Sequence, residues 1–290
     1  MFHKVAIIGL GLIGGSLGLA LRQAHMAEQI TGYDLGRGVS EQARKVGAID
    51  QAYIALADAV RGAELIVLAP PVGAMRALLQ DMATLASPGA VITDVASTKS
   101  QVISWAEEFL PDNLAFVGGH PMAGKEVSGV EAADATLFRN RIYCLTPTVK
   151  TSPTALNKVL AMVETLGARV RFLEPAEHDG QVALVSHLPF IASTALMATA
   201  SASNNWGDAA LLASSGFRDT TRLAGGSPEM YRDICLTNHE ALVRALDDYL
   251  ATLQILREHI AARAPRLNEL FASSQEARQQ WQATQGIDES

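Results

Sequence analysis

Residues 5–15 read V-A-I-I-G-L-G-L-I-G-G, a short apolar run that ends in three spaced glycines. Gly9 permits a tight turn out of a first strand, and Gly11 lets the backbone approach a pyrophosphate. Gly14 allows the following helix to pack closely on that strand. A strand, this glycine spacing and then a helix together predict a dinucleotide-binding turn.

A helix start and an acidic residue follow the glycines at the distances that dinucleotide binding needs. We expect Leu12 and Ile13 to open the helix, so that its free amides face the phosphates. Asp34 ends a second apolar stretch and lies 20 residues after the last glycine, where a carboxylate binds the adenosine ribose. The same carboxylate repels a 2′-phosphate, which favours NAD. Arg37 lies near enough to bind such a phosphate, so NADP is the alternative cofactor.

The composition indicates a soluble enzyme. With 49% apolar and 18% charged residues, the chain can form a large apolar core, and its 290 residues are enough for two domains. A net charge of −7 without a basic stripe argues against nucleic acid as a partner. We see no secretion signal and no long apolar run, and therefore expect a cytoplasmic protein with no membrane partner.

The two cysteines are expected to be reduced thiols. Cys144 and Cys235 lie in apolar surroundings and lack the C-x-x-C spacing of redox and zinc sites. The sequence also shows no clustering of metal ligands, so we expect no metal site.

Strand-like and helix-like stretches alternate through the first half of the chain. Short, β-branched apolar runs lie at 5–8, 30–33, 65–68, 90–93, 114–117, 142–146 and 169–173. Amphipathic or helical stretches lie between them at 73–85, 99–109 and 152–166. This alternation predicts an α/β, Rossmann-like domain with a mainly parallel sheet over residues 1–174.

The pattern becomes helical after residue 174. Residues 176–203 read as one helical stretch, in which Pro189 should kink the helix or open a turn. Further helices are predicted over 209–214, 229–260 and 266–281. We expect an all-α domain over residues 175–290, whose apolar surface pairs with a second copy of the chain.

Polar segments follow two of the predicted strands, at 94–99 and 118–124. Parallel sheets bind ligands outside the carboxyl ends of their strands, so both segments should face one crevice. His120 lies in the second segment, in a loop between two glycines and a proline, and its ordinary pKa suits a general base. The alternative is a loop histidine bonded to the backbone.

The helical half contributes further polar residues. After His178-Asp179 comes S-H-L-P, in which a buried His187 requires a hydrogen-bond partner, either a substrate or another residue. Arg218 and Arg222 are four residues apart, which would place both on one face if the segment is helical, and such a pair suits a small anionic ligand. The alternative for this pair is a solvated surface with a salt bridge to Asp219.

Taken in order, these segments make the chain resemble the prephenate/arogenate dehydrogenase family of tyrosine biosynthesis. The matching segments are G-L-G-L-I-G-G-S (9–16), D-V-A-S-T-K (94–99), G-G-H-P-M-A-G (118–124), L-T-P-T (145–148), H-D with S-H-L-P (178–189) and S-S-G-F-R-D-T-T-R (214–222). They cover roughly residues 4–235, and the combination of G-G-H-P-M-A-G with S-H-L-P and G-F-R-D is specific to this family, unlike the nucleotide motif alone. The resemblance implies a Rossmann-like domain, a helical dimerisation domain and an active site between them.

The resemblance also implies a reaction. The substrate would be a cyclohexadiene with a ring carboxylate and a C4 hydroxyl. His120 would take the hydroxyl proton as hydride leaves C4 for the nicotinamide. Carbon dioxide then leaves from C1 and the ring becomes aromatic. Ser97 matches the serine that hydrogen-bonds the histidine and the C4 oxygen, and it also lies beside the cofactor.

Four further residues match substrate-binding positions of the family. His187 matches a substrate-binding histidine, Arg222 a carboxylate-binding arginine, and Arg218 another basic residue. Glu126 matches an acid beside the catalytic histidine. Many prephenate-using relatives carry a second histidine where this chain has Phe190. Because of this difference, we expect the substrate to be arogenate, or both arogenate and prephenate.

Two other functions stay open at this point. A dehydrogenase of the β-hydroxyacid type shares the two-domain plan, but usually places a lysine base in the helical domain. Residues 176–263 contain no lysine, which argues against it. A non-catalytic NAD-binding regulator would have lost the base or the anion-binding residues, whereas His120, Ser97 and Arg222 are all present.

Overall fold

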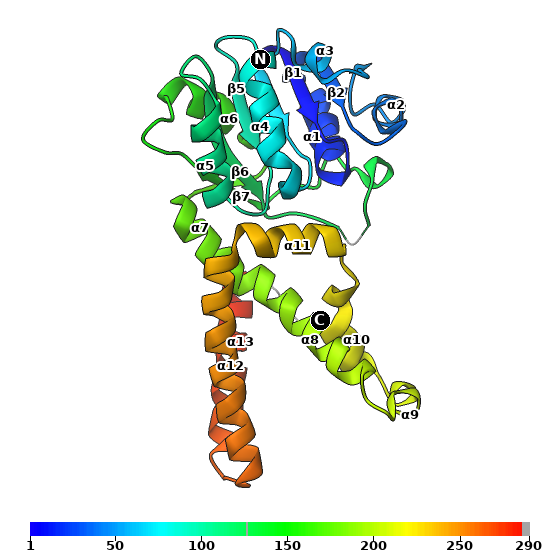
Figure 1. The fold of residues 1–290 in the computed structure, drawn as a ribbon, viewed down its shortest axis with the longest axis vertical. Coiled ribbons are helices and arrows are strands. Elements are labelled where there is room, and N and C mark those ends of the chain that lie inside the picture. The colour runs from blue at the N-terminus through cyan, green and yellow to red at the C-terminus, as the bar shows by residue number, and fades with distance from the viewer. Residues whose placement is uncertain (126, 286–290) are drawn as a thin grey trace. The chain divides into compact units, whose positions relative to one another are not determined.

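The computed structural model describes residues 1–125 and 127–285 (Figure 1). Its contacts divide the chain into two compact units, Met1–Leu242 and Val243–Ser290. The first unit holds the sheet and the helices that follow it, and all site residues discussed below belong to it.

An eight-stranded sheet forms the centre of the first unit, in the order β3-β2-β1-β4-β5-β6-β7-β8. Neighbouring strands pair in parallel, except that β7 runs antiparallel to β6. The strands are β1 (Phe2–Ile8), β2 (Ala27–Tyr33), β3 (Gln51–Ala52), β4 (Leu65–Leu68), β5 (Val91–Asp94), β6 (Ala115–Pro121), β7 (Ile142–Thr146) and β8 (Arg169–Phe172). The expected Rossmann-like domain with a mainly parallel sheet is confirmed.

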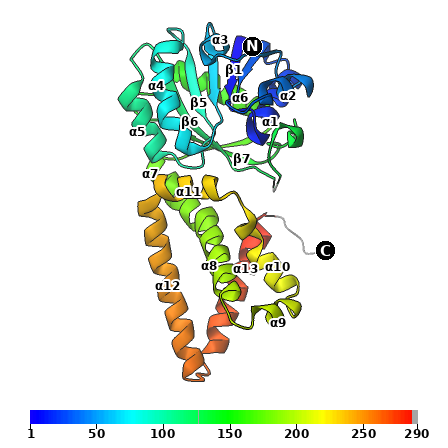
Figure 2. The ribbon, with the colours of Figure 1, turned by 45° about the vertical axis from the view of Figure 1, so that its right-hand side comes forward.

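Helices cover both faces of this sheet (Figures 1 and 2). They are α1 (Leu12–Gln23), α2 (Val39–Lys45), α3 (Leu56–Val60), α4 (Met75–Leu85), α5 (Ser100–Phe109) and α6 (Pro153–Thr165). Successive residues of a strand point to opposite faces. Ile7 of β1 therefore joins the apolar core with α1, α2 and α6, and Ile8 joins the core with α3, α4 and α5. Burial on both faces explains why these strands are apolar throughout.

Helices also make up the rest of the first unit. After β8 come α7 (Pro175–Val182), a π-helical turn (Ala183–His187), α8 (Leu188–Ser201), α9 (Trp206–Leu211), α10 (Ser215–Thr221), a 3₁₀ turn (Arg222–Gly225) and α11 (Pro228–Thr237). Pro189 is the second residue of α8 and has no amide to donate to the preceding turn. The π-helical turn that precedes it lets the chain stay helical from α7 to α8.

The predicted single helix over residues 229–260 is wrong. It is divided at Asn238 into α11 and α12 (His239–Ala261). The Asn238 side chain is buried and donates to the backbone oxygen of Asp179. This long-range hydrogen bond is absent from any local helical pattern, which is why the sequence did not reveal the break.

The second unit contains most of α12 and α13 (Leu267–Gln285). Large apolar side chains on both helices are exposed, among them Leu250, Ile255, Phe271 and Trp281. Exposed apolar side chains on this scale are typical of a surface that pairs with another chain.

One helical stretch of the described chain, Pro175–Ser201, is long and apolar enough to span a membrane by length and composition. The expectation that no such stretch exists is therefore wrong. The same stretch contains the buried side chains His178, Asp179 and His187, which hydrogen-bond to other parts of the first unit. Length and composition alone do not separate a membrane span from a helix of a soluble protein.

Candidate active site

The glycine loop between β1 and α1 has the geometry of a phosphate cradle. Gly9 has a φ of +94°, which disfavours other residues, and a Cβ at Gly14 would overlap the Gly9 carbonyl oxygen. A Cβ at Gly11 would meet nothing within 4 Å, so the backbone is open there. No side chain caps the first turn of α1, which leaves the amides of Leu12 and Ile13 available to an anion. These residues fit a dinucleotide.

Asp34 lies beside this loop, as its spacing predicted. Its Oδ2 accepts a hydrogen bond from the Leu10 amide at 2.7 Å, and its Oδ1 accepts one from the Gly36 amide at 2.7 Å. The carboxylate thus ties the end of β2 to the glycine loop, and its remaining lone pairs are free for hydroxyl donors. Arg37 is exposed three residues further on.

His120 does not lie in a loop, and that expectation is wrong. It belongs to β6, which continues through Pro121 because Gly118–Pro121 pair antiparallel with Tyr143–Thr146 of β7. The antiparallel strand extends the sheet beyond the point where the parallel pairing with β5 ends. The imidazole is therefore fixed on a strand and is only 9% exposed.

A buried ion pair binds the backbone amide and the carbonyl of Gly119, the residue before His120. Asp94 Oδ1 accepts from the Gly119 amide at 3.0 Å, and Lys99 Nζ donates to the Gly119 carbonyl at 2.7 Å. Lys99 and Asp94 also pair with each other, and both are fully buried. Sequence reasoning assigned no role to either residue. The sequence does contain a sign of this pair, because Asp94 and Lys99 are the oppositely charged first and last residues of the polar segment that follows a predicted strand.

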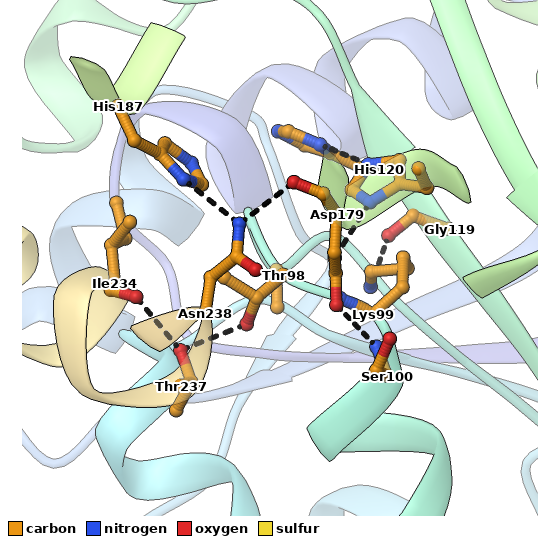
Figure 3. A network of polar contacts seen from close by, with 12 residues as sticks. Thr98, Lys99, Ser100, Gly119, His120, Asp179, His187, Ile234, Thr237 and Asn238 are labelled. Atoms are coloured by element: carbon orange, nitrogen blue, oxygen red, sulfur yellow. Dashed lines mark hydrogen bonds and ion pairs between the residues drawn. The ribbon is translucent and has the colours of Figure 1, made fainter. Parts of the chain in front are cut away.

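A row of buried side chains runs from His120 into α7 (Figure 3). His120 Nδ1 lies 2.9 Å from Nε2 of His178, whose Nδ1 lies 2.9 Å from Oδ1 of Asp179. The same Oδ1 accepts from the Lys99 amide at 2.7 Å, and Oδ2 accepts from the Ser100 amide at 2.8 Å. No role was predicted for His178 or Asp179, because their partners lie far away in the chain.

His187 has its hydrogen-bond partner within the protein. Its Nδ1 lies 3.2 Å from Nδ2 of Asn238, which also donates to the Asp179 carbonyl at 2.9 Å. His187 is 2% exposed. The protein partner is the alternative raised from the sequence, and it leaves Nε2 of the ring for a second contact.

The environment keeps both predicted site histidines neutral at pH 7. Burial lowers the pKa of His120 well below 6.5, and the nearby His178, Lys99 and His187 lower it further. Burial also lowers the pKa of His187 to about 4, although Asp179 acts in the opposite direction. A neutral imidazole is the form that accepts a proton.

The other predicted site residues are less enclosed. Ser97 is half-buried, and in the described part of the chain its hydroxyl has no hydrogen-bond partner. Arg218 is exposed and pairs with Asp219 at 3.2 Å, the surface salt bridge that the sequence had left open. Arg222 begins the 3₁₀ turn after α10. Burial raises the pKa of Tyr231, and the charge of Arg222 offsets this only in part. Glu126 lies outside the described residues.

Phe190 is buried one turn after His187. Its ring stacks on that of Tyr231 in α11, with centroids 3.3 Å apart and planes 5° from parallel. The residue that departs from the family pattern therefore packs between α8 and α11, close in sequence to a predicted substrate-binding histidine.

Neither metal ligands nor a disulfide were found at the site. Within residues 1–125 and 127–285 no group of three or more metal-binding side chains occurs. Cys144 is buried in β7, Cys235 is half-buried in α11, and both are free thiols.

Two family models match the chain in succession. Residues 17–172 match the nucleotide-binding domain of prephenate dehydrogenase, and residues 174–273 match its dimerization domain. Together they account for more than half of the chain.

Three relatives of the chain carry three different named activities. The cyclohexadienyl dehydrogenase of Zymomonas mobilis is 34% identical over 281 residues, which cover 96% of each chain. The crystal structure of Synechocystis arogenate dehydrogenase is 34% identical, with a TM-score of 0.81 over 96% of this chain and 99% of that one. The crystal structure of the prephenate dehydrogenase of A. aeolicus in complex with hydroxyphenyl propionate and NAD+ is 32% identical. Its TM-score is 0.90, over 97% of this chain and 98% of that one.

Proposed function

The chain belongs to the prephenate dehydrogenase family, and we propose that it oxidatively decarboxylates prephenate, arogenate or both, with NAD as cofactor. One observation carries the proposal beyond family membership: His120, a buried and neutral imidazole, lies on β6 of the same sheet whose β1 leads into the glycine loop. A base and a cofactor cradle at the carboxyl ends of strands in one sheet are what a dehydrogenase needs.

We assign separate roles in the reaction to the bound cofactor and to His120. NAD, when bound at the glycine loop, supplies the hydride acceptor. His120 accepts the proton of the C4 hydroxyl, so that a carbonyl forms at C4. Release of carbon dioxide from C1 then leaves an aromatic ring. Burial of His120 supports this role, because a base whose pKa lies below 7 is ready to accept a proton at neutral pH.

We assign the remaining contacts to substrate. Ser97 is placed at the C4 oxygen, which suits a half-buried hydroxyl with no other hydrogen bond in the described chain. His187 and Arg222 bind substrate polar groups, with Arg222 at the carboxylate. Arg218 has a supporting role, since Asp219 already pairs with it. Glu126 is assigned a place beside His120 by family resemblance alone.

The substrate preference is proposed from Phe190. Stacked on Tyr231, it offers an apolar wall where a histidine would offer a charge or a hydrogen-bond donor. Prephenate ends in a pyruvyl group and arogenate in an aminocarboxylate, so the charge near this wall decides between them. We propose arogenate use or dual use.

The cofactor is bound by Gly9, Gly11, Gly14, Leu12 and Ile13 at the phosphates. Asp34 binds the ribose, which favours NAD over NADP, and Ser97 adds a contact from the loop after β5. Arg37 would be the residue that reads a 2′-phosphate if NADP were used.

We further propose two domains, residues 1–174 for nucleotide binding and 175–290 for substrate binding and dimerisation. We also propose a homodimer, which the exposed apolar side chains of α12 and α13 support, and a cytoplasmic location. The acidic net charge of −7 supports the absence of a nucleic-acid partner.

A steady-state assay of the purified protein tests the proposal. Prephenate and arogenate are each offered with NAD and with NADP, and reduction of the nicotinamide is followed. We expect turnover with NAD and at least one of the two substrates. If neither substrate is turned over with either cofactor, the proposed function is wrong.

A further inference from the structure

Three buried groups form a row that ends at the proposed base: Asp179, His178 and His120. Both intervals of the row are hydrogen-bond distances of 2.9 Å. His178 is fully buried and Asp179 is 4% exposed, so water does not compete for these contacts. Each group in such a row restricts the proton positions of the next.

The backbone settles the state of Asp179. Its two oxygens accept hydrogen bonds from the amides of Lys99 and Ser100, which can only donate. A carboxylate with this many donors is ionised and acts only as an acceptor. Nδ1 of His178 must therefore carry a proton and donate it to Asp179.

This constraint passes along the row. When His178 is neutral and protonated at Nδ1, its Nε2 has a lone pair and accepts a hydrogen bond. The donor is then Nδ1 of His120, which leaves the lone pair of His120 on Nε2. We infer that Asp179, acting through His178, fixes the proton of His120 on Nδ1 and so makes Nε2 the proton acceptor of the reaction.

The inference rests on the proposed function for the identity of the reaction, but not for the position of the proton. Asp179 and His178 are positioning residues, because neither is assigned to touch substrate or cofactor. Asp179 has a second task, since it also binds the amides at the start of α5. Variants of His178 leave that second task intact and are therefore the sharper test.

His178→Gln and His178→Leu form the central pair of variants. A glutamine amide can donate to Asp179 and accept from Nδ1 of His120, whereas leucine can do neither. We expect His178→Gln to stay within about tenfold of the wild-type kcat, and His178→Leu to lose about 10²–10⁴-fold with little change in KM. The inference is overturned if the glutamine variant is as slow as the leucine variant, or if the leucine variant keeps the wild-type kcat.

His3 provides a matched control. Its Nδ1 lies 2.7 Å from Glu28, so it is also a histidine–carboxylate pair, but both side chains are exposed. His3→Leu should leave kcat unchanged. A loss equal to that of His178→Leu would mean that removing a histidine affects the protein in general, and would remove the support for a specific role.

Nitrogen-15 NMR of histidine-labelled protein reads the proton position without any turnover. With the His120 signals assigned by their loss in His120→Asn, Nδ1 should be the protonated nitrogen and Nε2 the bare one. His178→Leu removes the acceptor of the Nδ1 proton, so the preference of His120 for protonation on Nδ1 should be lost. A wild-type His120 protonated on Nε2 contradicts the inference. Absence of turnover with both substrates contradicts the proposed function and leaves the NMR result standing.

Discussion

Two aspartates hold the two halves of this site, and their partners lie at very different distances in sequence. Asp34 binds two backbone amides, of which the farther, that of Leu10, is 24 residues away. Asp179 also binds two backbone amides, but that of Lys99 is 80 residues away. The cofactor loop is therefore built from a local motif, while the chemical centre exists only after distant segments have packed together.

The largest expected effect comes from breaking the chemical centre at His120. His120→Asn removes the proton acceptor and should lower kcat by about 10²–10⁴-fold. The dissociation constant for NAD should not change, because the cofactor loop is a separate local structure. Stopped-flow and equilibrium binding measure the two quantities. A variant with a near-normal kcat would exclude His120 as the base.

The ion pair beneath His120 should respond in stability as well as activity. Lys99→Met leaves Asp94 buried without its cation, which typically costs about 3–5 kcal/mol in the free energy of unfolding. Urea unfolding measures this loss. Arg44→Met is the control, since its pair with Glu41 is exposed and should contribute under about 1 kcal/mol. Equal losses in both variants would show that the buried pair has no special role.

Acid should destabilise the chemical centre through His187. Its pKa is about 4 in the folded chain, whereas an unfolded histidine titrates near about 6.5. The unfolded chain therefore binds a proton first as the pH falls. Stability present above pH 6.5 is lost between pH 6.5 and 4, by roughly 3 kcal/mol. Unfolding of His187→Gln across this range should show a weaker dependence, and an unchanged dependence would contradict the buried histidine as its cause.

The same environment shifts the expected pH profile of the reaction. Burial lowers the pKa of His120, and the charged or titratable groups around it are His178, Lys99 and His187. His120 therefore remains neutral when the pH falls to 6.5, where an ordinary histidine is already half protonated. The decline of kcat/KM on the acid side should accordingly be centred below pH 6.5. A decline centred at 6.5 would contradict a lowered pKa of His120 in the enzyme before substrate binds.

Arg222 tests substrate binding by the helices after the sheet. Arg222→Ala should raise the substrate KM about ten- to hundredfold, because a charge-assisted hydrogen bond contributes about 1.5–3 kcal/mol. The KM for NAD should stay nearly constant, and the melting temperature should barely change for this exposed residue. Arg218→Ala is the matched control and should be milder. A collapsed melting temperature with an intact KM would show that Arg222 is structural.

The smallest expected effect is on cofactor choice. Asp34→Ser removes the ribose contact and the repulsion of a 2′-phosphate, so NAD use should weaken and NADP use improve, each by about tenfold. It also removes acceptors for the Leu10 and Gly36 amides, at about 0.5–1.5 kcal/mol each. Ratios of kcat/KM for the two cofactors measure the switch. A wild-type preference for NADP would make Arg37 the residue that reads the cofactor.

The sequence by itself determined what depends on neighbours in the chain. The glycine turn, the helix that follows it and the alternation of apolar strands each follow from local backbone and burial preferences. Strand β7 lies at Ile142–Thr146, as its apolar run predicts, and the α/β fold and the family follow from such segments.

Only the tertiary structure decided the rest. It placed His120 on a strand, because β7 runs antiparallel and extends the pairing of β6. It divided the predicted long helix at Asn238, whose amide binds Asp179 across 59 residues. It also brought His178 and Asp179 to the proposed base. A hydrogen bond between distant residues leaves no periodic trace in the sequence, so its partners become visible only when the chain is folded.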